Sequence, residues 1–157
     1  MDMIIRTAPA DREPPWELLL DADPSRELVS RYLAEGVCRT AEIDGRTVGV
    51  CVTISGAHPE CREIINIAVA PDYRRRGIAR RLIADAEALA VSEGISSMEI
   101  GTGNSGFDQL KLYQLCGYRI SGVITDYFTG RHEQEIIEHG IVCRDMVRLK
   151  KNLLVSL

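Results

Sequence analysis

The stretch of sequence that decides the fold is VAPDYRRRGIA, residues 69–79. It is preceded by the nearly continuous apolar run Glu63–Ala70, whose length and branched side chains predict a central strand buried on both faces. It is followed by Gly77–Glu93, in which apolar residues fall on one stripe of a long helix that Gly94 ends. The first turn of a helix has unpaired N–H groups and a partial positive charge, and glycine lets a ligand approach the backbone. We therefore expect this strand, basic turn and helix to bind an anion such as a pyrophosphate.

Length and composition describe an ordinary globular chain. Its 157 residues are 45% hydrophobic and 27% charged, which excludes disorder, collagen-like repeats and a coiled coil as descriptions of the whole chain. We expect one domain over residues 1–157. The 19 basic and 23 acidic residues give a net charge of −4, which argues against a general affinity for nucleic acid or an anionic membrane. No apolar run approaches the length of a membrane span and no signal peptide is recognised, so we expect a cytoplasmic protein.

The cysteines and histidines give no sign of a metal centre. The five cysteines contain no C-x-x-C pair, and their odd number does not suggest a disulfide framework, so we expect buried free thiols. His58, His132 and His139 lack metal-ligand spacing with a fourth group. We expect no metal ion.

The expected helices and strands do not follow the regular alternation of a doubly wound fold. Before the central strand we expect a strand at residues 3–7, a short helix at Trp16–Leu20, a helix with Asp23 as N-cap and Pro24 as first residue, and a hairpin of Val37–Ile43 and Thr47–Ile54 that turns at Asp44-Gly45. After the helix at Gly77–Glu93 we expect a strand at Ser97–Gly101, a helix at Phe107–Cys116, and strands at Tyr118–Phe128 and Ile141–Leu149. The sequence therefore predicts an α+β fold with a mixed, mostly antiparallel central sheet flanked by helices.

The glycine-rich segment GTGNSG, residues 101–106, suggests a second kind of site. It spells the G-x-G-x-x-G fingerprint of a dinucleotide site between a strand and a helix, and Asp126 lies near the place where a ribose-binding acid is sought. A dinucleotide fold needs further strand–helix units, but the chain after Gly106 is short and reads mostly as strands. We therefore prefer the anion site at residues 74–79.

Two motifs resemble those of the GNAT family of N-acetyltransferases. RRRGIA, residues 74–79, matches the family's motif Q/R-x-x-G-x-G/A and follows a strand. LYQLCGY, residues 112–118, resembles the family's L-Y-x-x-x-G-F/Y segment, at a spacing that is typical of the family. The resemblance covers roughly Gly49–Phe128. It implies a GNAT-like fold in which two central strands splay apart to bind acetyl-CoA as co-substrate.

The resemblance also implies a set of binding residues. Backbone groups of the central strand would pair with the pantetheine arm, N–H groups at the helix start would hold the pyrophosphate, and two arginine side chains would reach the adenosine phosphates. Tyr113 would protonate the departing thiolate, and Asn104 would lie near the cofactor. The set comprises Ile67, Ala68 and Val69 for the pantetheine arm, Arg76, Gly77, Ile78, Ala79 and Arg80 for the pyrophosphate, and Arg74 and Arg75 for the adenosine phosphates.

Glu63 is the second catalytic candidate. Only a neutral amine attacks a thioester, and this carboxylate at the start of the central strand is a candidate to accept the proton of an acceptor ammonium, directly or through water. Simpler roles stay open for three of the residues: a solvated strand-end carboxylate for Glu63, a core tyrosine for Tyr113 and a turn residue for Asn104.

The predicted function is transfer of the acetyl group from acetyl-CoA to a primary amine of a small molecule by direct attack. Acidic residues near the N-terminus, with Glu60 and Glu63, favour a cationic acceptor such as an aminoglycoside or a polyamine. We expect the segment Tyr127–Glu135 to shape the acceptor pocket. Two alternatives remain: a protein or peptide N-acetyltransferase, and a non-catalytic acyl-CoA-binding sensor module that would need neither Tyr113 nor Glu63. The resemblance also leaves homodimer formation open.

Overall fold

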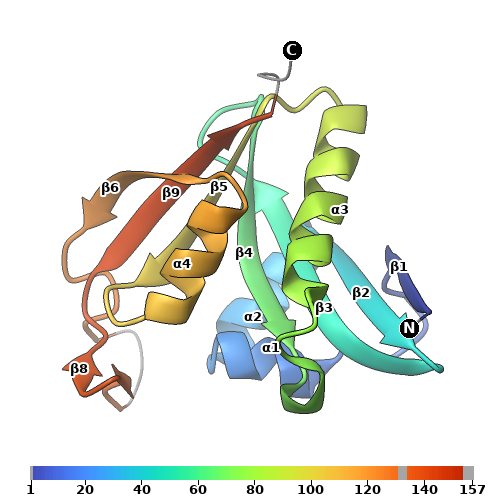
Figure 1. Ribbon diagram of the computed structural model, residues 1–157, viewed down its shortest axis with the longest axis horizontal. Coiled ribbons are helices and arrows are strands. Elements are labelled where there is room, and N and C mark those ends of the chain that lie inside the picture. Colours follow the sequence, from blue (N-terminus) through green and yellow to red (C-terminus); the bar gives the residue numbers. More distant parts are fainter. Residues whose placement is uncertain (1, 131–133, 154–157) are drawn as a thin grey trace.

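One seven-stranded sheet organises the part of the chain that the computed structural model describes, residues 2–130 and 134–153 (Figure 1). The strand order is β1-β2-β3-β4-β5-β9-β6, and within it only β4 and β5 run parallel, which confirms the predicted mixed, mostly antiparallel sheet. The strands are β1 (Met3–Thr7), β2 (Val37–Ile43), β3 (Arg46–Ser55), β4 (Cys61–Val69), β5 (Ser97–Gly103), β6 (Arg119–Ile124) and β9 (Met146–Asn152). The helices are α1 (Trp16–Ala22), α2 (Arg26–Glu35), α3 (Ile78–Ser92) and α4 (Phe107–Leu115), and a separate hairpin consists of β7 (Ile137–Glu138) and β8 (Ile141–Val142).

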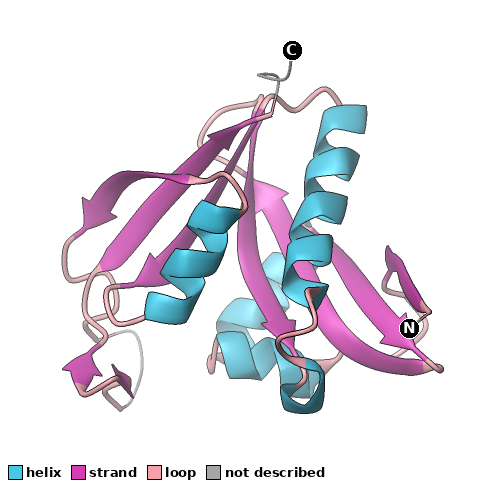
Figure 2. Ribbon diagram, in the orientation of Figure 1, coloured by secondary structure: helices cyan, strands magenta, loops and turns pink. Residues whose placement is uncertain are grey.

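Helices cover both faces of the sheet, and each face has its own hydrophobic core. Figure 2 shows α3 and α4 in front of the strands and α1 and α2 behind them. The apolar stripe of α3, including Leu82, is buried with Ile64 and Met98 on one face. Leu19 of α1 is buried with Val52 on the other face. Within the described residues, no helix combines the length and the apolar character that a membrane crossing requires.

The two parallel strands separate after a short stretch of pairing. Cys61–Ile64 of β4 pairs with the first four residues of β5, ending with Ile64 opposite Ile100. Beyond this pair Ile65–Val69 and Gly101–Gly103 no longer pair with each other, and Figure 1 shows the two strands diverging. We call this divergence the fork and the Ile64–Ile100 pair its vertex. The prediction of splayed central strands is confirmed.

A β-bulge in β4 coincides with the vertex of the fork. In the pairing with β3, Val52 lies opposite Asn66 and the next residue, Thr53, lies opposite Ile64. Ile65 is therefore one extra residue in β4. A bulge bends its strand and increases the local twist, so this extra residue turns β4 away from β5 at the point where their pairing stops.

Three predicted turn and cap positions are occupied by residues with positive φ. Asp44 and Gly45, with φ of 51° and 77°, join β2 to β3 as the hairpin prediction requires. Gly77 is the N-cap of α3 with φ of 79°. Gly94 follows the last turn of α3 with φ of 82°. The glycines at both ends of α3 therefore adopt a backbone conformation that other residues rarely take.

The start of α2 differs from the prediction. Asp23 is not the N-cap and Pro24 is not the first helical residue. Ser25 is the N-cap, and its hydroxyl accepts a hydrogen bond from the N–H of Leu28 at 3.2 Å. Asp23 instead accepts a hydrogen bond from the N–H of Ser25 at 3.1 Å. The Asp23 side chain thereby closes a turn around the proline, so helical geometry begins only after Ser25.

The two C-terminal strands also differ from the prediction. The expected single strand at Ile141–Leu149 is wrong, because β8 and β9 are separated by residues 143–145. The Asn104 side chain accepts hydrogen bonds from the N–H groups of Arg144 and Asp145, at 2.7 and 2.9 Å, and this replaces strand pairing there. The expected strand at Tyr118–Phe128 is shorter, because the chain turns after Ile124.

Candidate functional site

The basic turn leads into a helix N-terminus that no side chain caps. Gly77 is the N-cap of α3, and the helix receives no side-chain hydrogen bond at this end. A Cβ atom placed on Gly77 would have no neighbour within 4 Å, so open space lies beside the turn. The N–H groups of Ile78, Ala79 and Arg80 belong to this first turn. They are available to a ligand, and the helix dipole favours a negatively charged one.

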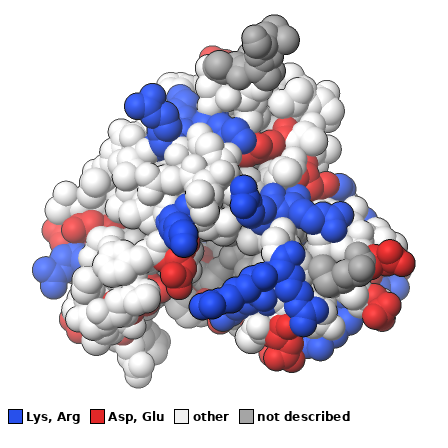
Figure 3. Space-filling model, viewed as in Figure 1, with Lys and Arg blue, Asp and Glu red and all other residues white. Residues whose placement is uncertain are grey.

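The three arginines of the turn have different surroundings. Arg74 forms an ion pair with Asp21 of α1 at 2.9 Å. Arg76 lies over the ring of Tyr73, 5.0 Å from its centre. Arg75 has a left-handed backbone, with φ of 63°. Figure 3 shows basic side chains gathered over the N-terminal end of α3. Arg74 is thus ion-paired with α1, whereas Arg75 and Arg76 form no ion pair with any described residue.

The predicted pantetheine contacts lie on β4 beyond the vertex of the fork. Ile67, Ala68 and Val69 pair with β3 along one edge of β4. Their other edge faces the side from which β5 has departed. The carbonyl of Val69 accepts a hydrogen bond from Arg74 Nε at 3.1 Å. Apart from this contact, no described strand pairs with that edge of β4, which is what an extended ligand with amide groups needs in order to bind alongside a strand.

Tyr113 lies on the buried side of α4. Its side chain is 4% exposed and belongs to the same core as Leu82. Burial raises the pKa of its hydroxyl, and the thiols of Cys51 and Cys116 act in the same direction. The hydroxyl is therefore protonated at neutral pH, the state that a proton donor requires.

Glu63 lies at the vertex of the fork and is ion-paired. Its Oε2 is 2.8 Å from Nη1 of Arg148 on β9. The same guanidinium binds Glu99 of β5 through Nη2, also at 2.8 Å, and Glu63 and Glu99 are direct neighbours in the parallel pairing. The sequence motifs do not indicate Glu99 or Arg148 as members of the site. The only signal for them is strand alternation, which does not show that β9 lies beside β5.

Asn104 is engaged in the fold. Its Oδ1 accepts the two hydrogen bonds that separate β8 from β9, and its Nδ2 donates to the carbonyl of Val142 at 3.1 Å. These contacts fit the turn role that the sequence left open. The contact with the cofactor stays a prediction.

The glycines of residues 101–106 are explained by close packing. A Cβ atom on Gly101 would lie 2.6 Å from Met146 Sδ, and one on Gly103 would overlap Cys143 Sγ. A Cβ atom on Gly106 would overlap the hydroxyl of Thr102. The fingerprint spacing thus arises from three separate steric requirements and does not indicate a dinucleotide site.

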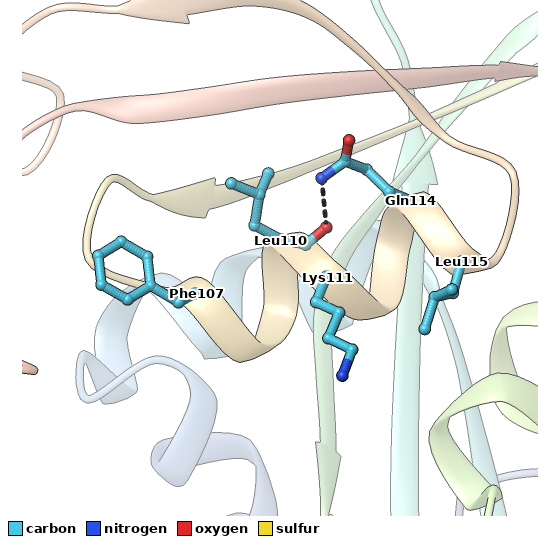
Figure 4. Close-up of a pocket in the computed structure, with 5 residues that line it drawn as sticks. All are labelled: Phe107, Leu110, Lys111, Gln114 and Leu115. Carbon is cyan, nitrogen blue, oxygen red and sulfur yellow. Dashed lines mark hydrogen bonds between the residues drawn. The ribbon is translucent and has the colours of Figure 1, made fainter.

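A shallow pocket of about 430 Å³ lies along the outer side of α4 (Figure 4). Neither Tyr113 nor Glu63 contributes to it. The Gln114 side chain in it donates a hydrogen bond to the Leu110 carbonyl at 3.0 Å. Its lining residues are Phe107, Leu110, Lys111, Gln114 and Leu115.

A second pocket of about 380 Å³ lies beside the free end of β5. It is lined by residues from three segments, within 126–130, 134–136 and 142–144. The position of a Cβ atom on Gly103 would be 3.6 Å from the ring of Phe128, which lines this pocket. The segment expected to shape the acceptor pocket, Tyr127–Glu135, contributes to it, although residues 131–133 of that segment lie outside the described residues.

The five cysteines are free, and Cys51 and Cys61 are buried. Burial raises the pKa of each of the five thiols. Over residues 2–130 and 134–153, no group of three or more His, Cys, Asp and Glu side chains is arranged to hold a metal ion.

Comparison with known proteins identifies the family. The model of the acetyltransferase (GNAT) family matches residues 2–118. YvbK of Bacillus subtilis (strain 168), described as an uncharacterized N-acetyltransferase, is 44% identical over 138 residues, which is 88% of this chain and 88% of that protein. The structure of an IAA acetyltransferase from Bacillus cereus ATCC 14579 is 42% identical with a TM-score of 0.91, over 96% of this chain and 99% of that chain.

A third relative was solved with a ligand. A GNAT family acetyltransferase from Elizabethkingia anophelis, with acetyl-CoA bound, is 36% identical with a TM-score of 0.92, over 96% of this chain and 97% of that chain. The chain belongs to the GNAT family, and it is an acetyl-CoA-dependent acetyltransferase. The predicted fold, enzyme class and donor are thereby confirmed.

Proposed function

We propose that the chain, acting as one domain over residues 1–157, transfers the acetyl group of acetyl-CoA to a primary amine of a small molecule by direct attack. The observation that carries this proposal is the fork. It has an uncapped helix N-terminus at its open end and an oriented carboxylate, Glu63, at its vertex. A donor that extends from the helix to the vertex would bring its thioester toward that carboxylate.

The chain's own groups match the donor in chemistry and in order. The N–H groups from Arg76 to Arg80 would hold the pyrophosphate, since they combine unpaired donors with the positive end of α3. Arg75 is the arginine best placed to reach a further phosphate, because Arg74 is held by Asp21. The free edge of β4 at Ile67–Val69 would bind the amide groups of the pantetheine arm.

In this proposal Tyr113 and Glu63 supply the proton transfers. The amine nitrogen forms a bond with the thioester carbonyl carbon, and the C–S bond breaks. The thiolate receives a proton from the Tyr113 hydroxyl, and the tyrosinate regains a proton from the nitrogen as the amide forms. The proton that the acceptor ammonium loses passes to Glu63, directly or through water. The products are an amide and the free thiol of CoA.

The pocket beside the end of β5 supports a small acceptor. Its volume of about 380 Å³ is within the usual range of small-molecule sites. Asp126 and Glu135 line it together with the aromatic ring of Phe128, and Arg144 is the one basic residue among its described lining residues. Carboxylates beside an apolar surface suit a cationic amine with an organic body, such as a polyamine or an aminoglycoside.

Two tests separate this proposal from its alternatives. Calorimetric titration with acetyl-CoA, with NAD and adenosine diphosphate as controls, measures the donor site. Release of CoA thiol is then followed with a panel of small amines and with peptides that carry a free amino terminus. Turnover of small amines and not of peptides supports the proposal, and the reverse preference would identify a peptide N-acetyltransferase. Tight acetyl-CoA binding without thiol release from any of these amines or peptides would mean that the acceptor belongs to another chemical class.

A further inference from the structure

Two carboxylates and one guanidinium form a compact cluster at the vertex of the fork. Glu63 on β4 and Glu99 on β5 are direct neighbours, and Arg148 of β9 binds both at 2.8 Å. The three side chains are only 17–19% exposed. Gly101 makes room for this arrangement, because a Cβ atom there would lie 3.1 Å from Arg148 Nη1. The cluster is therefore enclosed and its geometry is fixed from several sides.

The two carboxylates are not equivalent. Glu99 uses both oxygens: Oε2 binds Arg148 and Oε1 accepts a hydrogen bond from the Cys61 thiol at 3.0 Å. Glu63 uses Oε2 for Arg148, and no described residue donates a hydrogen bond to its Oε1. Glu99 is thus fully engaged in holding the guanidinium. Glu63 is held on one side and has one oxygen left for a ligand.

We propose that Arg148, fixed by Glu99, is a positioning residue that holds Glu63 through its Oε2 and leaves its Oε1 to receive a cationic acceptor amine. This inference rests on the proposed function, in which Glu63 accepts the proton of the ammonium. It adds Arg148 and Glu99, which hold the Glu63 carboxylate in place. It also states that the reacting group of the acceptor binds as a positively charged ammonium.

Electrostatics explains why two carboxylates need the guanidinium. Neighbouring carboxylates repel each other, and without a cation one of them takes up a proton. Arg148 binds both carboxylates and compensates one of their charges, while Oε1 of Glu63 stays available to an ammonium. The other titratable groups beside the cluster are Lys150, which lies opposite Glu99 in the sheet, and the neutral Cys61 thiol. Neither separates Glu63 from Glu99 as Arg148 does.

The test compares the pH dependence of kcat/KM for the amine in the wild-type enzyme and in Arg148→Met, at saturating acetyl-CoA. Methionine keeps an unbranched side chain but removes the charge. We expect the acidic limb of the profile to move to higher pH by about one unit or more, the size of effect that an adjacent opposite charge has on a carboxylate. The KM for acetyl-CoA should not change. Arg148→Lys should restore most of the profile, because the cation returns.

Arg39→Met is a matched control. Arg39 and Asp85 form an ion pair at 2.8 Å between β2 and α3, with side chains 20% exposed, so its loss removes a similar pair far from the fork. This variant should lose stability without any movement of the pH profile. An Arg148→Met profile that merely scales down at every pH, as in Arg39→Met, would overturn the positioning role.

Failure of the proposed function looks different. If the wild-type enzyme acetylates no amine, or if Glu63→Gln retains the wild-type profile, the role of Glu63 itself is wrong. If Glu63→Gln abolishes the acidic limb while Arg148→Met and Glu99→Gln both leave it in place, only the inference about Arg148 fails. Melting temperatures of the variants confirm that each is folded at the temperature of the assay.

Discussion

Substituting Gly77 with alanine should weaken acetyl-CoA binding far more than it weakens the fold. An alanine with φ near 79° costs about 1–2 kcal/mol of folding free energy, which lowers Tm by about 2–4 °C per kcal/mol in a chain of this size. Its Cβ meets no protein atom, so no further clash arises within the protein. It does enter the space beside the first N–H groups of α3. Loss of one hydrogen bond to a charged phosphate costs about 1.5–3 kcal/mol, which corresponds to a Kd weaker by about tenfold to a hundredfold.

Gly94→Ala at the other end of the same helix is the matched control. Gly94 has φ of 82°, and a Cβ atom on it also meets nothing within 4 Å. Both variants should therefore show a similar fall in Tm by calorimetry or circular dichroism. Only Gly77→Ala should show the weaker Kd in a titration with acetyl-CoA. Equal affinities for the two variants would refute the assignment of the pyrophosphate to this turn.

Three further outcomes follow from the site and the core. Tyr113→Phe should lower kcat by about a hundredfold or more, the usual effect of losing a general acid, and should leave the Kd for acetyl-CoA unchanged. The control Tyr118→Phe loses only a hydrogen bond to Glu87, so it should affect stability alone. The pKa of Glu99 is lowered by the Cys61 thiol and by Arg148. The contribution of Glu99 to stability is therefore complete above about pH 4.5 and is lost as pH falls through the pKa of the folded state. In chemical denaturation at several pH values, the free energy of unfolding should fall less steeply with acid in Glu99→Gln than in the wild type. Burial raises the pKa of Cys38 to about 11, so a thiol reagent at pH 7 should label it much faster in the unfolded chain than in the folded one, and equal rates would contradict its burial.

The elements that local sequence determines are the ones that the sequence predicts well. Asp44-Gly45 forms the expected turn because both residues tolerate positive φ. Gly77 is the N-cap of α3 and Gly94 follows its last turn, as expected, because these glycines and the apolar stripe all belong to one local segment. The predicted N-cap of α2 is wrong by two residues, because Asp23 and Ser25 are both residue types that cap helices well. Asp23 instead closes a turn with the N–H of Ser25, and the apolar spacing of the helix does not show that turn.

Residues whose partners are distant in the chain could not be placed in this way. Asn104 interrupts a strand about forty residues later by binding its N–H groups. Arg74 forms an ion pair with Asp21, and Glu63 forms one with Arg148. The partners in each pair are far apart in the chain and come together only in the folded protein. The motifs therefore identified the family and its donor, whereas the partners of Glu63 depend on strand order and had no local signal.

Because the bulge is one extra residue in β4, the opening of the fork depends on the number of residues in this strand and not on which side chain stands at Ile65. Ile65 and Asn66 both belong to the side of β4 that faces α1 and α2, so the alternation of side chains changes phase there. A substitution at Ile65 preserves this phase, whereas deletion of one residue would move either Glu63 or Val69 to the opposite face of the sheet. Among homologous chains the spacing between Glu63 and Gly77 should accordingly tolerate far less variation than the residues within it.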